Sequence, residues 1–326
     1  MKFKRMIALL MSASVAAGGM VMPVAVYADD EEIQELNELE DDDGVTVDEG
    51  DRPYISLGED LTSDQRATVL RLFGISEEDL SDYDVSYVTN SEEHEYLDGY
   101  ISSDKIGSKS LSSVVVMQGD EGDGIKVTTY NISYCTVGMY KNALATAGIE
   151  DAEVIVAAPF SISGTAALVG AIKAYEVMTG DETDEDNVDA ALNELVVTGE
   201  ITEETGEDSD TIEGFVAYVK SAVVAGGYTD EDSIEDVIDD GCEQFNISLS
   251  ESQKQQLVEL MQKIGELDLD ADTLMEQAQS IYDKVASIVG EDTLNNIANY
   301  LKSDDNIFVR IWNAIVNFFK NLFNMG

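Results

Sequence analysis

Between residues 53 and 180, the apolar positions switch repeatedly between the spacing of strands and the spacing of helices. Short runs rich in valine, isoleucine and threonine are separated by turn-forming residues, which is typical of strands. Other runs repeat their apolar residues at helical spacing and end at a glycine, which is typical of helices. The predicted strands are 85–89, 113–117, 125–132 and 154–158, and the predicted helices are 62–73, 137–147 and 165–178.

Local signals fix several ends of these elements. Thr62 and Gln65, and again Ser250 and Gln253, have the spacing of a capping box, which marks the start of a helix. Pro159 has no backbone N–H to donate, so the strand before it is expected to end there. The order strand, helix, strand, helix predicts a βαβα crossover unit, and therefore a sheet that is partly parallel.

Beyond residue 181, polar and acidic loops separate segments with helical spacing, and no strand is predicted. The chain is therefore predicted to be α+β, with a mixed sheet that contains the crossover unit, then a mainly helical domain and a C-terminal amphipathic helix. The predicted boundaries are 53–180 for the α/β-type domain, 181–305 for the helical domain and 306–326 for the amphipathic helix. The helices expected in the second domain are 188–197, 211–225, 233–245, 251–267, 271–289 and 292–301.

Residues 306–326 carry the most distinctive pattern of the chain. One broad arc of the predicted helix is apolar, and the opposite strip holds four asparagines together with Arg310 and Lys320. The segment has no acid, and it contains the only tryptophan of the protein. The apolar arc consists of Phe308, Ile311, Trp312, Ile315, Val316, Phe318, Phe319, Leu322 and Phe323.

Such a helix has three conceivable positions. It can lie in a membrane interface, with its aromatic face at the acyl boundary and its two bases near anionic headgroups. It can instead dock on a groove of this chain or of a partner protein. A helix that spans the bilayer is least favoured, because its polar strip would face lipid. The number of aromatic residues favours the membrane interface, and docking stays open as the alternative.

The N-terminus predicts export. Three bases within the first five residues precede an apolar stretch over 6–24, and Val26 and Ala28 are suited to the positions before a signal-peptidase cut. A retained membrane anchor is the alternative, because about 20 apolar residues can span a bilayer. Glycines and a proline interrupt the outer half of the stretch, so residues 1–28 are predicted to be a signal peptide that is cleaved near Ala28. The expected location is outside the cell or at its surface.

The charge of the chain excludes several functions. It has 67 acids against 18 bases and a formal net charge of −49, which excludes nucleic-acid binding because phosphate contacts need lysine and arginine. A single histidine excludes a histidine-rich zinc site. No cofactor or metal site is predicted, and calcium is expected to bind only weakly and diffusely. Residues 29–51 hold 13 acids and no base, so 29–52 is predicted to be a disordered linker rather than a cation-binding tail.

Several motifs carry a resemblance to a known family. They are Asn131-Ile132, the run Met139-Tyr140-Lys141-Asn142-Ala143-Leu144 with Ala147-Gly148, the run Ala157-Ala158-Pro159-Phe160 with Ser163-Gly164-Thr165-Ala166-Ala167-Leu168, and the short motifs Val88-Thr89-Asn90, Leu97, Gly99 and Ile106-Gly107. With these motifs the chain resembles, over about residues 53–301, the secreted bacterial family catalogued as domain of unknown function 1002. The resemblance implies an exported or envelope-associated protein of Gram-positive bacteria. It implies no activity and no catalytic residues.

The stretch from Ser161 to Thr165 joins a predicted buried strand to a predicted helix, and it is the candidate anion or ligand site. The first turn of a helix has unpaired N–H groups and a partial positive charge, and both attract anions. The hydroxyls of Ser161, Ser163 and Thr165 would add donors, and Gly164 would let the backbone approach a ligand. The simpler interpretation, which we favour, is that Ser163 caps the helix and Gly164 allows close packing on the sheet. The stretch matches neither a P-loop nor the Gly-x-Ser-x-Gly motif of hydrolases.

Cysteine and histidine offer a second candidate chemistry. Cys135 lies two residues before a predicted helix, where a thiolate is stabilised, and His94 is the one histidine that can act as its base. A buried, unreactive thiol is the commoner outcome among such apolar neighbours. Cys135 and Cys242 can form one disulfide or stay two free thiols, and the sequence leaves this open. Because His94 stands among glutamates, we expect a solvated surface residue with a raised pKa.

Two functions follow from these observations. The first is an exported, envelope-associated acidic protein that acts by binding or contact at the cell surface, where its C-terminal helix meets a membrane surface or a partner protein. The second is an extracellular, hydrolase-like enzyme that uses the junction from Ser161 to Thr165. An open cleft there, with His94 or a carboxylate within hydrogen-bond reach, would favour the enzyme. A filled and capped helix start would favour contact.

Overall fold

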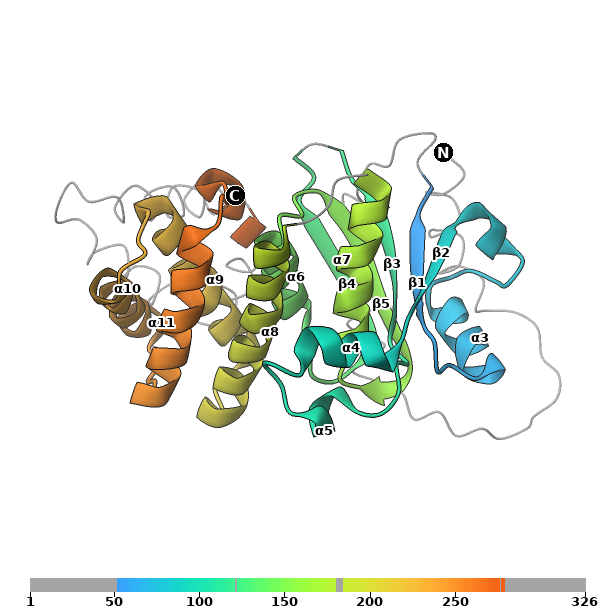
Figure 1. Ribbon diagram of the computed structural model, residues 1–326, viewed down its shortest axis with the longest axis horizontal. Helices are drawn as coiled ribbons and strands as arrows, with labels where there is room; N and C mark the ends of the chain where they lie inside the picture. Colours follow the sequence, from blue (N-terminus) through green and yellow to red (C-terminus); the bar gives the residue numbers. More distant parts are fainter. Residues whose placement is uncertain (1–51, 121, 180–183, 276, 279–326) are drawn as a thin grey trace, which may run out of the picture.

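The computed structural model describes residues 52–120, 122–179, 184–275 and 277–278. Within this part of the chain, a five-stranded mixed sheet lies beside a group of long helices, and helix α6 lies between them (Figure 1). This arrangement confirms the predicted α+β class. The predicted signal peptide (1–28), the acidic run (29–51) and the amphipathic helix (306–326) lie outside the described residues.

The sheet has the strand order β2-β1-β3-β5-β4. β1 and β2 pair in parallel, β4 and β5 pair in parallel, and β3 is antiparallel to both of its neighbours. Helix α6 connects the parallel strands β4 and β5, and α7 follows β5, which confirms the predicted crossover unit. The strands are β1 Tyr54–Gly58, β2 Asp84–Val88, β3 Ser113–Gln118, β4 Ile125–Ile132 and β5 Ala152–Ile162.

Most helices begin at a polar residue whose side chain bonds the first turn. Thr62 and Ser250 do so through the predicted capping boxes of α3 and α11. Thr89 starts α4 with a third capping box, and Asp208 caps α9. The helices are α3 Ser63–Leu72, η1 Asp79–Asp82 (a 3-10 helix), α4 Asn90–Leu97, α5 Ser103–Ile106, α6 Val137–Thr146, α7 Thr165–Thr179, α8 Glu185–Thr205, α9 Ser209–Gly226, α10 Glu231–Phe245 and α11 Glu251–Glu266.

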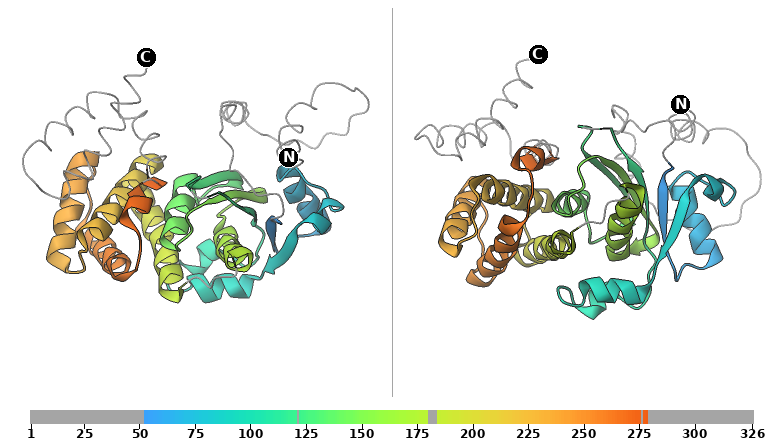
Figure 2. Two further views of the ribbon diagram at one scale, coloured as in Figure 1. Left: turned by 90° about the horizontal axis from the view of Figure 1, so that it is seen from above. Right: turned by 45° about the horizontal axis from the view of Figure 1, so that its top comes forward.

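Helices cover both faces of the sheet, and α3 and α7 lie on opposite sides of it (Figure 2). Side chains alternate along β3 between the two faces. Val114 and Val116 belong to the core formed with α6 and α7, whereas Val115 and Met117 belong to the core formed with α3. The sheet is therefore buried between two layers of helix at its centre.

One strand runs past the end that the sequence predicted. β5 continues to Ile162 although Pro159 lies within it, so the prediction of a strand end at Pro159 was wrong. Pairing with β3 stops at Ala157, and on the other side a bulge at Asn131 interrupts the pairing with β4. Pro159 therefore lies where neither neighbouring strand needs a backbone N–H from it.

The remaining helices, α8 to α11, pack around a second apolar core that includes Phe215, Val219 and Leu257. The helices predicted at 188–197, 211–225, 233–245 and 251–267 are confirmed. Of the helix predicted at 271–289, residues 271–275 and 277–278 are helical; its other residues and the helix predicted at 292–301 lie outside the described residues. Leu192 and Leu195 of α8 belong to the core of the sheet, so the two parts are joined by apolar contacts. The domain boundary at residue 181 stays a prediction. No helix in the described part is both long enough and apolar enough to cross a membrane.

Candidate functional site

The candidate junction runs from Ser161, at the end of β5, to Thr165, the first residue of α7. Ser161 is exposed, Ser163 is half-buried and Thr165 is buried. Gly164 has a φ of +95°, a conformation that residues with a side chain rarely adopt. A Cβ atom there would lie 2.7 Å from both Ile132 Cγ2 and Tyr140 Oη. The Tyr140 hydroxyl also donates to the Gly164 carbonyl at 2.6 Å, so protein side chains fill the space that a ligand would need at Gly164.

Side chains from other elements bond the first turn of α7. The Ala167 N–H donates to Ser112 Oγ at 3.0 Å, and Ser112 precedes β3. The Thr165 hydroxyl donates to Glu93 Oε1 on α4 at 2.9 Å. Ser163 Oγ lies 3.3 Å from Thr165 Oγ1. The cap at the Ala167 N–H thus comes from Ser112 and not from Ser163, because the fold brings the end of a distant loop to this helix start.

Glu93 is the residue of this junction that sequence reasoning missed. It stands in the acidic run that begins α4, yet its side chain is 2% exposed. Burial raises its pKa to about 7, and the hydrogen bond from Thr165 opposes that shift. One signal could have revealed it: Glu93 precedes the buried Leu97 by four residues, so both lie on the same face of the helix.

The junction therefore has one feature expected of the hydrolase-like enzyme and one expected of the protein that acts by contact. A carboxyl group, that of Glu93, lies within hydrogen-bond reach of Thr165, as an enzyme would require. The pair is enclosed, because Thr165 is 1% exposed, and the helix start is bonded as the contact interpretation expects. The assignment of Ser161, Ser163, Gly164 and Thr165 as a ligand site stays a prediction, and the enclosure of Glu93 and Thr165 weighs against catalysis there.

Both ring nitrogens of His94 contact groups other than Cys135. Its Nδ1 lies 2.7 Å from Asp98 Oδ1, and its Nε2 lies 3.1 Å from the Gly107 carbonyl oxygen. The predicted rise of its pKa is confirmed in direction, with Asp98 as the first cause and the Gly107 carbonyl as the second. Its side chain is half-buried rather than fully solvated, because it bridges α4 to the residue after α5.

The two cysteines are free thiols in different cores. Cys135 is 1% exposed, lies in the core of the sheet and has its pKa raised by burial. Cys242 is half-buried beside the core of the helical part, and burial raises its pKa to about 11. A raised pKa and an enclosed sulfur both oppose the thiolate that a nucleophile needs.

We expect Cys135 to resist alkylation in the folded protein. At pH 8, iodoacetamide should label Cys242 slowly and leave Cys135 unmodified, because reagent and hydroxide reach only the half-buried sulfur. Mass spectrometry of tryptic peptides over time measures both rates in one sample. In guanidinium chloride the two rates should become equal, and rapid labelling of Cys135 without denaturant would contradict its burial.

A second buried polar cluster joins α6, α8 and α9. Lys220 Nζ lies 3.0 Å from Glu194 Oε1, and the two side chains are 2% and 0% exposed. Lys220 Nζ also donates to the Asn142 carbonyl at 2.8 Å and to Thr146 Oγ1 at 3.0 Å. Desolvation lowers the pKa of Lys220 and raises that of Glu194, while each partner opposes the shift of the other. The hydrogen bonds that this ammonium group donates are therefore all to groups inside the protein.

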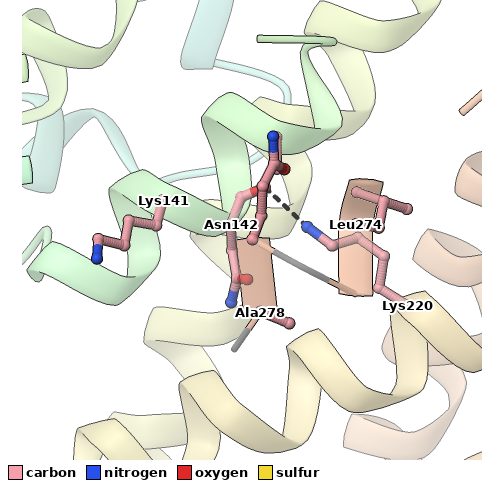
Figure 3. Close-up of a pocket in the computed structure, with 7 residues that line it drawn as sticks. Lys141, Asn142, Lys220, Leu274 and Ala278 are labelled. Atoms are coloured by element: carbon pink, nitrogen blue, oxygen red, sulfur yellow. Dashed lines mark hydrogen bonds between the residues drawn. The ribbon is translucent and has the colours of Figure 1, made fainter. Parts of the chain in front are cut away.

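A small cavity lies beside this cluster (Figure 3). Its volume of about 10 Å³ corresponds to a single water molecule, so it has no room for an organic substrate. The Lys220 amine points toward the Asn142 carbonyl, as the dashed line in Figure 3 marks. The lining residues are Lys141, Asn142, Ala145, Lys220, Leu274, Gln277 and Ala278. Within the described ranges, no group of three or more histidines, cysteines and acids is arranged to hold a metal ion.

Comparison with known proteins decides the family. The model of the family described as "Protein of unknown function (DUF1002)" matches residues 57–281. The chain is a member of the DUF1002 family. This DUF1002 chain is also 39% identical over 267 residues to "Uncharacterized protein YpuA" of Bacillus subtilis (strain 168). The aligned region covers 82% of this chain and 89% of the relative. No solved structure matches the DUF1002 chain significantly.

Proposed function

We propose that this DUF1002 protein is exported and acts by contact at the cell surface, where its C-terminal amphipathic helix brings an acidic body to a membrane interface. The observation that carries the proposal is the aromatic arc over 306–326 in a segment without acids, within a chain of net charge −49. The signal peptide predicted for 1–28 supplies the route out of the cell. Partner docking of the same helix is the alternative use of the arc.

In the described part of the chain, the reactive groups are buried, which supports a function by contact rather than by catalysis. Burial shifts the pKa of Glu93, Cys135, Glu194 and Lys220, and each of these groups is nearly or fully buried. Such groups mark an active site when they open into a cleft. Here they bond within the protein, or lie beside a space that fits one water. A hydrolase that used the junction at Ser161–Thr165 would first have to open it.

The negative charge of the rest of the protein opposes binding of the C-terminal helix to an anionic membrane. Anionic headgroups would repel a chain with 67 acids, so the apolar face has to supply most of the binding energy. Two bases contribute about 1 kcal/mol each at an anionic surface, and burial of one phenylalanine contributes about 1.5–3 kcal/mol. Calcium, bound weakly and diffusely by the acids, would reduce the repulsion without a dedicated site.

Co-sedimentation with lipid vesicles tests the proposal. Protein that starts at Asp29 is compared with a version that ends at Asp305, on phosphatidylcholine vesicles with and without phosphatidylglycerol, and with and without calcium. We expect the longer protein to pellet with vesicles and the shorter one to stay in solution. Phe318→Ser combined with Phe319→Ser should reduce binding at least about tenfold, because it removes two apolar anchors.

The matched control changes the opposite strip of the same helix. Asn317→Ser combined with Asn321→Ser alters the same number of positions but leaves the apolar arc intact. It should bind as the unchanged protein does. Equal pelleting of the full-length and shortened proteins would overturn membrane contact, and loss of self-association in the shortened protein would then support docking.

A further inference from the structure

Two neighbouring ionisable side chains of helix α4, Glu93 and His94, point in different directions and contact different elements. Glu93 points inward to the start of α7, where it accepts a hydrogen bond from Thr165. His94 points to the residue after α5, where its Nε2 meets the Gly107 carbonyl. Asn90 also donates to that carbonyl, at 3.3 Å. The attachment of α4 to each neighbour therefore includes one group that can gain or lose a proton near neutral pH, beside contacts that do not, such as those of Asn90 and of Glu92 with Lys173.

The surroundings of Glu93 suit a neutral carboxyl group. Its Oε2 is buried and has no hydrogen-bond partner of normal geometry among the described residues, and the same holds for Ser110 Oγ. The side chains of Asn90 and Ser110 still lie close enough to oppose the rise of the Glu93 pKa, but they do not outweigh burial. An ionised carboxylate can only accept hydrogen bonds, whereas a protonated one has an O–H to donate. An unpaired charge at this depth is costly, and a protonated carboxyl avoids that cost.

Among the described residues, none of the charged and titratable groups around Glu93 forms an ion pair with it, although the nearby charge of His94 opposes the rise of the Glu93 pKa. From α7, Lys173 is bound to Glu92 at 2.5 Å. From the start of α6, the Cys135 thiol and the Tyr140 phenol are both buried, and burial raises the pKa of each, so they stay neutral. On its own helix, the ring of His94 is bonded to Asp98 and to Gly107. No cation therefore makes a direct ion pair with Glu93 in the described part of the chain.

The surroundings of His94 suit an imidazolium ion. Both ring nitrogens face an oxygen that can only accept, at 2.7 Å for the Asp98 carboxylate and 3.1 Å for the Gly107 carbonyl. A neutral imidazole has one N–H, so one of the two contacts would lose its hydrogen bond. Only the protonated ring satisfies both.

We infer that α4 is held in place in a proton-dependent way, with one proton on Glu93 and one on His94, and that rising pH, by removing these protons, releases α4 from the start of α7 and from the segment after α5. Loss of either proton weakens the attachment of α4. Deprotonation turns the neutral Glu93 carboxyl into an anion and the His94 cation into a neutral ring. Release would free the Thr165 hydroxyl, at the start of α7, from Glu93. The inference does not depend on the function proposed above.

The pH range follows from the direction of each shift. The folded-state pKa of Glu93 is raised to about 7 by burial, and that of His94 is raised by Asp98 and by the Gly107 carbonyl. A group whose pKa is higher in the folded state stabilises the fold at low pH, and that stabilisation is lost as pH rises through the folded value. Ordinary surface acids are ionised by about pH 6, so changes between pH 6 and 8.5 isolate these two groups.

Hydrogen–deuterium exchange of the full chain tests the inference. Exchange is measured between pH 6 and 8.5, corrected for intrinsic rates, and peptides from 90–106 are compared with peptides from α9. Protection of 90–106 is expected to fall about tenfold or more across this range relative to α9, since one pKa unit is a factor of ten. Glu93→Gln should retain most of the protection at pH 8.5, and His94→Gln should lower it already at pH 6.

Glu95→Gln is the matched control, because Glu95 lies on the same helix but is exposed. It should follow the unchanged protein at every pH. Protection of 90–106 that does not depend on pH in the unchanged protein would overturn the inference, and this measurement needs no variant to fold. A Glu93→Gln profile that falls as steeply as the Glu95→Gln profile would overturn the role of Glu93.

Discussion

Replacement of Lys220 by methionine is expected to lower the free energy of unfolding by about 3–5 kcal/mol. The substitution keeps the length of the side chain but leaves the Glu194 carboxylate, which is 0% exposed, without its counter-charge. It also removes the donor that the Asn142 carbonyl and the Thr146 hydroxyl share. Urea unfolding followed by circular dichroism measures the loss, and a smaller value with an unchanged slope would show that water reaches the carboxylate.

The double variant separates the charge from the packing. Lys220→Met combined with Glu194→Leu removes both charges, and Thr146 can then donate to the Asn142 carbonyl within its own helix. We expect it to be at least about 2 kcal/mol more stable than Lys220→Met alone, because a buried ion pair is often replaced by apolar residues at little cost. Lys254→Met is the control at a partly exposed pair with Asp239, and it should cost less than about 1 kcal/mol. A double variant as unstable as the single one would contradict the role of the uncompensated charge.

The sequence predicted those parts of the fold whose signals are local. The capping boxes at Thr62 and Ser250 depend on two residues that lie three positions apart, and the structure contains both. The crossover of β4, α6 and β5 follows from the period of the apolar residues and from the rule for parallel strands. The short β1 could not be predicted in the same way. Its residues include Ser56 and Gly58, and they form a strand because β2 and β3 pair with them from distant parts of the chain.

The candidate site was predictable only in part, for the same reason. The strand–helix junction at Ser161–Thr165 was identified from local sequence, but its bonding partners Glu93 and Ser112 come from other elements. Glu93 stands in a run of acids, and only packing decides that it points inward while Glu95 stays exposed. Lys220 offered a clearer signal, since it is a lone charge among apolar residues of α9, and such a charge is buried only with a partner.

Substitution of Gly138 by alanine is expected to destabilise the protein by about 2–3 kcal/mol, although it adds only one methyl group. A Cβ atom at Gly138 would lie 1.9 Å from Glu213 Oε2, and Glu213 is 2% exposed. This carboxylate comes from α9 to the first turn of α6, where it accepts a hydrogen bond from the capping residue Thr136 and benefits from the positive end of the helix. The methyl group would displace it into a space that α6 and α9 already fill. Thermal and urea unfolding measure the effect.

Two comparisons show whether the close approach of Glu213 is the cause. Gly99→Ala is the matched control, because a Cβ there meets no atom within 4 Å, and it should change stability by less than about 0.5 kcal/mol. Glu213→Ala alone should destabilise the protein, since Thr136 and the start of α6 lose their acceptor. Gly138→Ala added to Glu213→Ala should then cost little, because the clashing group is gone, and the two effects should be strongly non-additive. Additive losses would mean that Gly138 is required for its backbone and not for the carboxylate, and α6 would then be held against α9 by apolar packing and by the bonds of Lys220 to Asn142 and Thr146.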